Sequence, residues 1–177
     1  MTTPDEQLLE RAGTYDAQVL AEIYDRFAAR IYGYLYRTLG DAFQAEDLAG
    51  EVFLKLLHAL RTNRAPRERL EGWLYRVAHN LAIDLFRRQE KGRAVPLDEE
   101  LVAAGNQPPD IVEDRQIKQR LRASIRCLTT DQQQVILLRF AEERPVAEVA
   151  RLMGKSEGAI RILQHRAVSR LRKLLGA

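Results

Sequence analysis

Apolar residues recur along most of the chain at the three- and four-residue steps that are typical of amphipathic helices. The first stripe covers residues 20–39 and is followed by Gly40, where a left-handed helix cap is expected. Further stripes cover residues 48–60 and 72–88, and no segment alternates with the period of a strand. The pattern predicts an all-α first domain over residues 1–90, built as a bundle of three or four helices.

Two stretches lack a helical period. Residues 61–69 are basic and contain Pro66, which indicates a loop. From about residue 89 to residue 110, glycines and prolines interrupt any regular element and the charge turns acidic. These features predict a flexible linker over residues 91–112. Its acidic side chains are Asp98, Glu99, Glu100 and Asp110.

A second small helical domain is predicted over residues 113–177. A stripe resumes at Ile117, and Thr130 with Gln133 matches a capping box that would open the next helix. Pro145 suits the first turn of a short helix that ends at Gly154, and Ser156 is placed to cap a last helix that reaches about residue 175. The fold class is therefore two all-α domains joined by a linker.

The last two predicted helices have the features of a helix-turn-helix. Gly154 supplies the turn, and each helix offers small or apolar side chains to its partner. The expected anchors are Val149, Ala150, Met153, Ile160, Leu163, Ala167, Leu171 and Leu174. The opposite face is polar and basic, as DNA binding requires, although an ordinary helical hairpin with a solvated basic face has the same composition.

The net charge of +3 conceals four blocks of alternating sign. Residues 1–57 hold 10 acidic and 5 basic side chains, and residues 58–90 hold 4 and 7. Residues 91–114 hold 6 and 2, and residues 115–177 hold 5 and 14. The last block favours a polyanionic partner, most simply nucleic acid, whereas the acidic blocks indicate a second kind of partner.

The sequence argues against catalytic, metal and membrane sites. Residues 154–158 match the G-x-S-x-G pattern of hydrolases, but a predicted helix precedes the serine where that motif needs a strand. His58, His79 and His165 lie on separate predicted elements, and Cys127 is the single cysteine, so we expect no metal, no cofactor and no disulfide. The apolar runs are too short to span a membrane, and the acidic N-terminus does not resemble a secretory signal, so a cytoplasmic location is expected.

Both domains carry segments that resemble one family. AEDLAGEVFLKLLHAL (45–60) and WLYRVAHNLAIDLFRR (73–88) resemble region 2 of the extracytoplasmic-function (ECF, group IV) sigma factors of bacterial RNA polymerase, in the sigma-70 family. SEGAIR (156–161) and LRKLL (171–175) resemble region 4 of the same family. The resemblance implies a non-enzymatic subunit, monomeric when free, that gives core polymerase its promoter specificity.

The resemblance also implies partners and the residues that contact them. Region 2 would dock on the clamp helices of the largest polymerase subunit through Glu46, Asp47, Glu51, Phe53 and Lys55, region 4 would bind the beta flap, and a separate anti-sigma factor is expected. The chain departs from the family pattern at Gly50, where glutamine is usual. Capture of a flipped minus-ten base would involve Arg61, Thr62, Asn63, Arg64, Arg67, Arg76, His79, Asn80, Asp84, Arg87 and Arg88. Recognition of the minus-thirty-five element would involve Lys155, Ser156, Glu157, Gly158, Arg161, Ile162, His165 and Arg166.

Three points stay open at the level of sequence. Trp73 is either a stacking platform or, as its helical spacing with Val77 and Leu81 favours, part of the core. The acidic linker either follows a path built for RNA in the polymerase or is a plain tether. The chain as a whole is either a sigma factor, a repressor or activator independent of polymerase, or a helical adaptor for an acidic partner.

Overall fold

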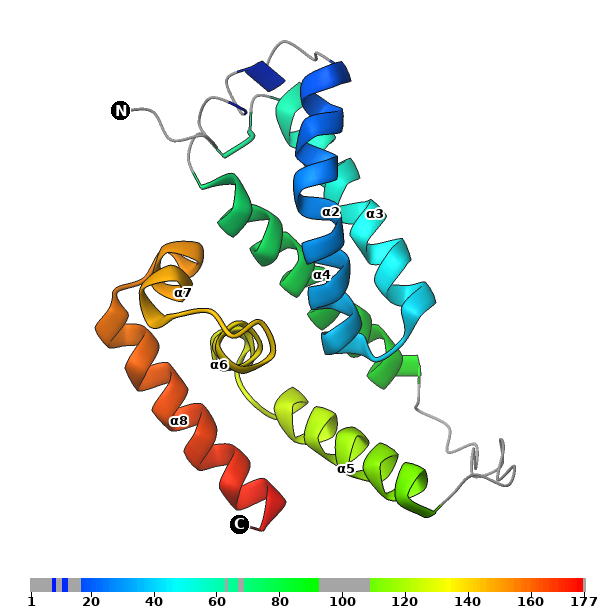
Figure 1. Ribbon diagram of the computed structural model, residues 1–177, viewed down its shortest axis with the longest axis vertical. Coiled ribbons are helices and arrows are strands. Elements are labelled where there is room, and N and C mark those ends of the chain that lie inside the picture. Colours follow the sequence, from blue (N-terminus) through cyan, green and yellow to red (C-terminus); the bar gives the residue numbers. More distant parts are fainter. Residues whose placement is uncertain are drawn as a thin grey trace.

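The computed structural model describes residues 8, 11–12, 17–62, 64–66, 69–92 and 109–176, with side chains omitted at 90, 92 and 109–114. Within these residues every regular element is a helix, which confirms the all-α prediction (Figure 1). The helices form two bundles, α2–α4 and α5–α8. We call them the first and the second bundle.

The first bundle contains three long helices, α2 (Ala17–Leu39), α3 (Ala42–Arg61) and α4 (Leu70–Gly92). Gly40 adopts the expected left-handed conformation with φ of 78°, and the Asp41 carboxylate then caps α3 by accepting the Gln44 amide at 2.9 Å. Most of the predicted apolar stripes of α2 and α3 are buried, whereas Tyr24, which was predicted on the α2 stripe, is 53% exposed. The core residues of these two helices include Ile23, Phe27, Ile31, Leu35, Val52 and Leu56.

The second bundle contains α5 (Pro109–Arg126), α6 (Thr130–Ile136), the π-helical turn η1 (Leu137–Ala141), α7 (Val146–Met153) and α8 (Glu157–Leu175). The linker prediction overlapped both neighbouring helices, because α4 continues to Gly92 and α5 begins at Pro109. A proline is tolerated in the first turn of a helix, because the backbone amides there have no hydrogen-bond acceptor within the helix and the missing amide hydrogen costs no bond. Residues 93–108, including Asp98, Glu99 and Glu100, lie outside the described residues, and so does the side chain of Asp110.

The capping box before α6 is shifted by one residue from the predicted pair. Thr129 caps the helix with Gln132, whereas Gln133 is buried and donates its side-chain amide to the Leu128 carbonyl at 2.9 Å. Thr129 and Thr130 are followed closely by three consecutive glutamines, so the sequence allows more than one threonine–glutamine pair to form the capping box. Gln133 is buried, which leaves Gln132 as the glutamine of the box. Pro145 likewise stands one position before the first helical residue of α7.

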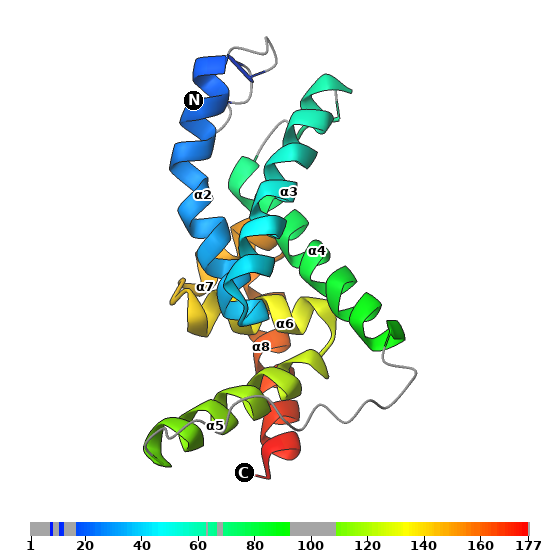
Figure 2. The same cartoon turned by 90° about the vertical axis from the view of Figure 1, so that its right-hand side faces the viewer.

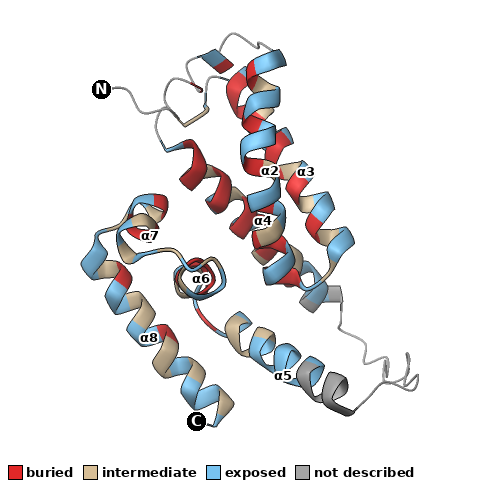
Figure 3. Ribbon diagram, in the orientation of Figure 1, coloured by how far each residue is buried: buried red, intermediate tan, exposed pale blue. Residues whose placement is uncertain are grey.

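The two bundles share one hydrophobic core. Val135, Leu138, Val149, Leu152 and Ile160 of the second bundle belong to the same buried cluster as the core of α2, α3 and α4. Figures 1 and 2 show α6 and α7 on the side that faces α4, with α8 farther away. Buried residues lie along α4 and on α6 and α7 (Figure 3). The two predicted domains are therefore packed against each other in this structure.

Candidate nucleic-acid interface

Helices α7 and α8 form the predicted helix-turn-helix. Gly154 adopts φ of 64° and ψ of 35°, and the Ser156 hydroxyl accepts the Ala159 amide at 3.2 Å to start α8. Both sequence assignments are confirmed. Of the predicted anchors, Val149, Ala150, Ile160 and Ala167 are buried, and Met153, Leu163 and Leu171 are half-buried. Leu174 is 39% exposed, so the buried stripe ends before it and its prediction as an anchor was wrong.

The outward face of α8 carries the residues predicted to contact DNA. Arg161, Ile162, His165 and Arg166 are exposed, as are Ser156, Glu157 and Gly158 at the start of the helix. Arg161 donates to Glu157 at 2.8 Å, and both side chains reach solvent. Lys155 is half-buried and pairs with Asp131 at 3.0 Å. A shallow groove beside this face is lined by Arg139, Val146, Arg161, Gln164, His165 and Val168.

A second polar surface follows α4. Arg76, Asn80, Asp84 and Arg87 are exposed and recur at three- and four-residue steps, so they form one ridge along the helix. Asp84 and Arg87 lie 3.6 Å apart. We call this set the α4 ridge. Trp73 is half-buried against the core near the start of the ridge, as its spacing favoured.

The end of α3, the following loop and the end of α4 carry further exposed polar residues. Arg61, Thr62, Arg64 and Arg88 are exposed, and the Thr62 hydroxyl donates to the His58 carbonyl at 2.9 Å. Asn63 and Arg67 lie outside the described residues.

The structure does not support His79 as part of the DNA-contacting surface. Its side chain is 1% exposed and lies between the Tyr34 hydroxyl at 2.7 Å and the Thr130 carbonyl at 3.0 Å. Because a carbonyl can only accept, Nε2 carries the hydrogen and Nδ1 accepts from Tyr34. Burial lowers the pKa of His79 to about 4. His79 is thus a neutral interior group that joins α2, α4 and the start of α6.

A third surface lies on α3. Glu46, Asp47 and Lys55 are exposed and Glu51 is half-buried, 3.5 Å from Lys55. Phe53, the other residue predicted to dock, is 9% exposed and packs its ring 4.9 Å from that of Tyr24. Position 53 lies towards the core side of α3, about 120° around the helix from Asp47. The free chain therefore does not expose this ring, and its docking role stays a prediction.

The α3 surface also contains apolar side chains that the sequence prediction missed. Phe43 and Leu54 are 82% and 66% exposed and share the side of α3 that carries Asp47 and Gly50. A Cβ added at Gly50 meets no heavy atom within 4 Å, so this position lies open on the same side. In the sequence, Phe43 and Leu54 lie outside the apolar stripe of α3, and this position could have identified them as exposed apolar residues. We call Phe43, Asp47, Gly50, Glu51 and Leu54 the α3 face.

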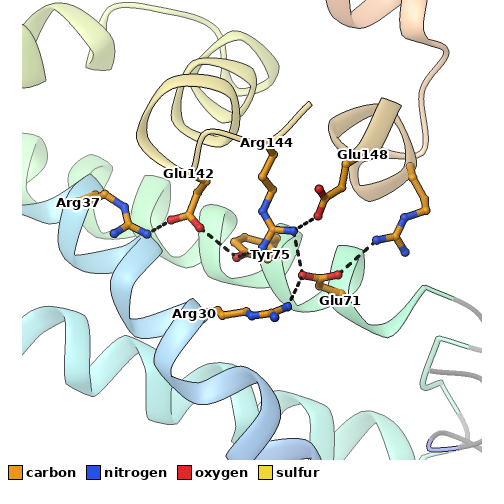
Figure 4. Close-up of polar contacts among 8 residues, drawn as sticks. Arg30, Arg37, Glu71, Tyr75, Glu142, Arg144 and Glu148 are labelled. Carbon is orange, nitrogen blue, oxygen red and sulfur yellow. Dashed lines mark hydrogen bonds and ion pairs between the residues drawn. The ribbon is translucent and has the colours of Figure 1, made fainter. Parts of the chain in front are cut away.

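Charged side chains also gather between the two bundles, where the sequence predicted no site. Figure 4 shows Glu71 and Tyr75 of α4 beside Arg144, which follows η1. Arg144 donates to Glu71 at 3.0 Å and to the Tyr75 hydroxyl at 2.7 Å, and it also pairs with Glu148. Arg30 and Arg151 reach Glu71 at 3.3 and 3.4 Å, and Arg37 pairs with Glu142. We call these eight residues the interdomain cluster.

The described residues contain neither a metal-binding cluster nor a membrane-spanning helix. No group of three or more histidine, cysteine, aspartate or glutamate side chains among them could hold a metal ion. None of the helices that they form has the length and apolar character needed to cross a membrane.

Comparison with known proteins agrees with this geometry. Residues 23–92 match the family Sigma-70 region 2, and residues 124–173 match Sigma-70, region 4. The chain is 36% identical over 171 residues to the ECF RNA polymerase sigma factor BldN of Streptomyces coelicolor, covering 96% of this chain and 65% of BldN. It is 32% identical over 162 residues to the ECF RNA polymerase sigma factor SigX of Bacillus subtilis, covering 85% of this chain and 80% of SigX. The chain belongs to the ECF sigma factors.

The surfaces described above therefore belong to the two DNA-binding regions of a sigma factor, which directs RNA polymerase in transcription initiation. The first bundle holds sigma region 2, and the second holds region 4. The solved structure of CnrH in complex with the cytosolic domain of CnrY aligns with 97% of this chain and 97% of that chain. The TM-score is 0.63 at 21% identity, so the two chains share a fold.

Proposed function

We propose that this ECF sigma factor divides promoter recognition between α8 and α4, and that it docks on core polymerase through the α3 face. The observation that carries the proposal is the presence of three exposed polar surfaces on one chain, on separate helices of the two bundles. In this proposal the chain is a group IV member, is not itself an enzyme and acts in the cytoplasm.

The exposed face of α8 is suited to duplex DNA. Arg161 and His165 lie four residues apart and project from the same side of a helix whose partner helix is fixed by the Gly154 turn. A recognition helix presents such side chains to the major groove, where arginine reads guanine or grips phosphate. The minus-thirty-five contact is assigned to this face.

The α4 ridge is suited to an opened strand. A flipped base needs hydrogen-bonding groups, which Asn80 and Asp84 provide, and a separated strand needs cations beside it, which Arg76 and Arg87 provide. Arg61 and Arg64 at the end of α3 extend the cationic surface. Minus-ten recognition and melting are assigned to this ridge and the loop.

The α3 face combines charge with exposed apolar area, as protein interfaces do. Asp47 and Glu51 are flanked by Phe43 and Leu54 on a helix that makes its main contacts with α2 and α4. Charged groups set the specificity of such a contact, and the buried apolar side chains contribute much of its affinity. Docking on the clamp helices of core polymerase is assigned to this face, with region 4 on the beta flap.

A separate anti-sigma factor is also part of the proposal. CnrH has been solved with the cytosolic domain of CnrY, and the sigma factor RpoE with the anti-sigma factor NepR from Bartonella quintana. The second of these aligns with 89% of this chain at a TM-score of 0.53. These likenesses motivate a search for such a partner.

Transcription from a pool of random duplexes tests the proposal without a known promoter. Purified core polymerase and this chain are incubated with the pool, and the 5′ ends of the RNA are sequenced. We expect RNA only when the chain is present, with two shared sequence elements upstream of the start sites. A repressor, activator or adaptor gives no chain-dependent RNA from this mixture, and that result contradicts the proposal.

A further inference from the structure

Ile162 is an apolar side chain on the outward face of α8, where its neighbours are polar. It is 54% exposed, and Arg161 and Arg166 beside it are exposed as well. The packing of α8 does not use Ile162, because the buried positions of this helix are Ile160 and Ala167. A single exposed apolar residue is ordinary on a protein surface, so its place on the helix decides whether it has a role.

Ile162 lies at the centre of this outward face. At about 100° per residue, Gly158 and Ile162 each lie within about 20° of the direction opposite the buried Ile160. Arg161 lies about 80° to one side of that direction, and Arg166 lies about 60° to the other side. Two arginines therefore flank a central strip that carries no side chain at position 158 and a branched apolar one at position 162.

An ion pair draws Arg161 away from the central strip. Arg161 donates to Glu157 at 2.8 Å, and Glu157 lies about 120° around the helix from the centre of the outward face. On the same flank, Arg161 and His165 line the shallow groove together with Arg139 of η1. The cationic groups of this flank thus gather beside the strip and leave Ile162 uncovered.

Gly158 lets another surface approach α8 closely, one turn before Ile162. A Cβ added at Gly158 would meet only the Ser156 hydroxyl oxygen, 4.0 Å away, so the space outside this position is open. Glycine is a poor helix former, so it does not help α8 to form. Its contribution is a backbone without a protruding side chain, which suits the entry of the first turns of α8 into a groove.

The major groove of DNA presents one apolar feature to such a side chain. Its base edges expose hydrogen-bond donors and acceptors, and thymine alone adds a C5 methyl group. An isoleucine pressed against a donor or acceptor displaces water and offers no hydrogen bond in return, which is unfavourable. Against a methyl group, the same contact withdraws two apolar surfaces from water. Isoleucine is also stiff at χ1, so it loses little freedom on contact.

We infer that Ile162 reads a thymine C5 methyl group at the centre of the minus-thirty-five element, between the positions that Arg161 and Arg166 contact. The inference rests on the proposed function, in which α8 enters the major groove, and it names a base that this face selects. The centre of the element is then recognised by an apolar contact, and the arginines supply the polar contacts on either side.

Deoxyuridine tests this contact directly, because it differs from thymidine only in the missing C5 methyl group. Holoenzyme assembled from core polymerase and this chain is bound to a promoter recovered from the duplex pool. Each thymine of the upstream element, on either strand, is replaced in turn by deoxyuridine, and the relative affinity is measured by competition. We expect about fourfold weaker binding at one thymine or at two adjacent ones, the factor for leaving one methyl group in water.

Three variants assign the effect to position 162. Ile162→Ala truncates an exposed side chain, so α8 should keep its helicity, and the variant should bind the thymine and deoxyuridine duplexes equally. Ile162→Val keeps a branched apolar group and should retain most of the discrimination. Ile117→Ala is the matched control, because it truncates an isoleucine that is 56% exposed on α5, and it should discriminate like the parent. Combining base and side-chain changes isolates their interaction from effects on the duplex alone.

A second pair of duplexes places the methyl group on another base. The sensitive thymine–adenine pair is replaced by a cytosine–guanine pair, with or without a methyl group at C5 of the cytosine. The parent should bind the 5-methylcytosine duplex about fourfold more tightly than the cytosine duplex. Ile162→Ala should not distinguish the two.

Three results would overturn the inference. These are an upstream element without thymine, an element in which no thymine methyl group affects binding, or equal sensitivity to deoxyuridine in Ile162→Ala and the parent. In each of them the pool still yields chain-dependent RNA, so the proposed function stands and the methyl contact alone fails. A pool that yields no chain-dependent RNA contradicts the proposed function itself, and this inference falls with it.

Discussion

At the scale of single residues, burial decides what a polar side chain of α4 can do. His79 and Asn80 are adjacent in sequence, yet His79 is buried between Tyr34 and Thr130 whereas Asn80 is exposed on the α4 ridge. The buried imidazole resists protonation because its charged form loses hydration, which outweighs the favourable influence of the Thr130 carbonyl and of Asp131. A single residue step along α4 therefore separates an interior hydrogen-bonding group from the exposed α4 ridge.

The depressed pKa of His79 predicts a pH-dependent stability. The unfolded chain takes up a proton near pH 6.5 and the folded chain only near pH 4, so this contribution to stability is complete above pH 6.5 and is lost as pH falls towards 4. Between pH 7 and pH 5 we expect the free energy of unfolding to fall by about 2 kcal/mol. Urea denaturation at a series of pH values measures this.

Two matched histidine variants test whether His79 causes this pH dependence of stability. His79→Gln should flatten the slope between pH 7 and pH 5, whatever it does to the absolute stability. His58→Gln, which changes an exposed histidine on α3, should retain the slope. An equally steep loss of stability in His79→Gln would rule out His79 as the titrating group.

Individual site residues could be predicted from the sequence when the role assigned to a residue agreed with the side of the helix on which it lies. The exposed residues of α8 follow from helical spacing and charge, whereas the family resemblance supplied those of the α4 ridge. Phe53 and His79 are buried, although the family resemblance implied partner contacts for both, because the resemblance did not take their helical face into account. The sequence did not identify Glu71 as a site residue, because an acidic residue in the first turn of a helix is common. Its importance follows only from the three arginines that surround it in the structure.

At the scale of elements, amphipathic periodicity located the helices and local chemistry located their ends only approximately. Gly40, Gly154 and Ser156 act as predicted because each is the single suitable residue at its position. Tandem threonines and glutamines left the α6 cap ambiguous, and Pro109 was read as a breaker although it begins α5. The π-helical turn η1 had no sequence signal, and it leads directly to Glu142 and Arg144 of the interdomain cluster.

The α3 face carries a prediction at this scale. Asp47→Lys with Glu51→Lys should weaken binding to core polymerase at least about tenfold, because like charges opposed across an interface repel. Helicity should not change, since both residues lie on the solvent side of α3. Fluorescence anisotropy of labelled chain titrated with core polymerase measures the affinity.

A double reversal elsewhere in the first bundle controls for net charge. Glu22→Lys with Asp25→Lys alters exposed positions on α2 and disturbs only the exposed Glu22–Arg11 pair, which contributes little. It should bind core polymerase like the parent. Equal weakening by the two pairs would show that overall charge and not the α3 face governs docking.

At the scale of the whole molecule, the sequence indicated two domains but not how they pack. Each bundle follows from its own apolar stripes, whereas the shared core and the interdomain cluster depend on contacts between residues as far apart as Glu71 and Arg151. The fit of Gly72 against Leu152 is invisible without coordinates. Domain packing of this kind leaves no period in a sequence, so it could not be predicted.

Two surfaces on separate bundles imply that promoter binding and strand opening can be separated by mutation. Arg161→Ala should weaken promoter binding by about 5- to 150-fold, the equivalent of about 1–3 kcal/mol for a base contact. Complexes that still form should open normally. Asn80→Ala with Arg87→Ala should change binding by less than about threefold but prevent opening, because the separated strand loses its contacts on α4.

Permanganate reactivity of unpaired thymines, measured per bound complex on a promoter recovered from the duplex pool, tests this division most directly. We predict strong reactivity for the parent and for Arg161→Ala, and at least about tenfold less for the Asn80→Ala, Arg87→Ala variant at equal occupancy. A double variant that opens the duplex as well as the parent, or that loses binding and opening together, would contradict the assignment of strand capture to α4.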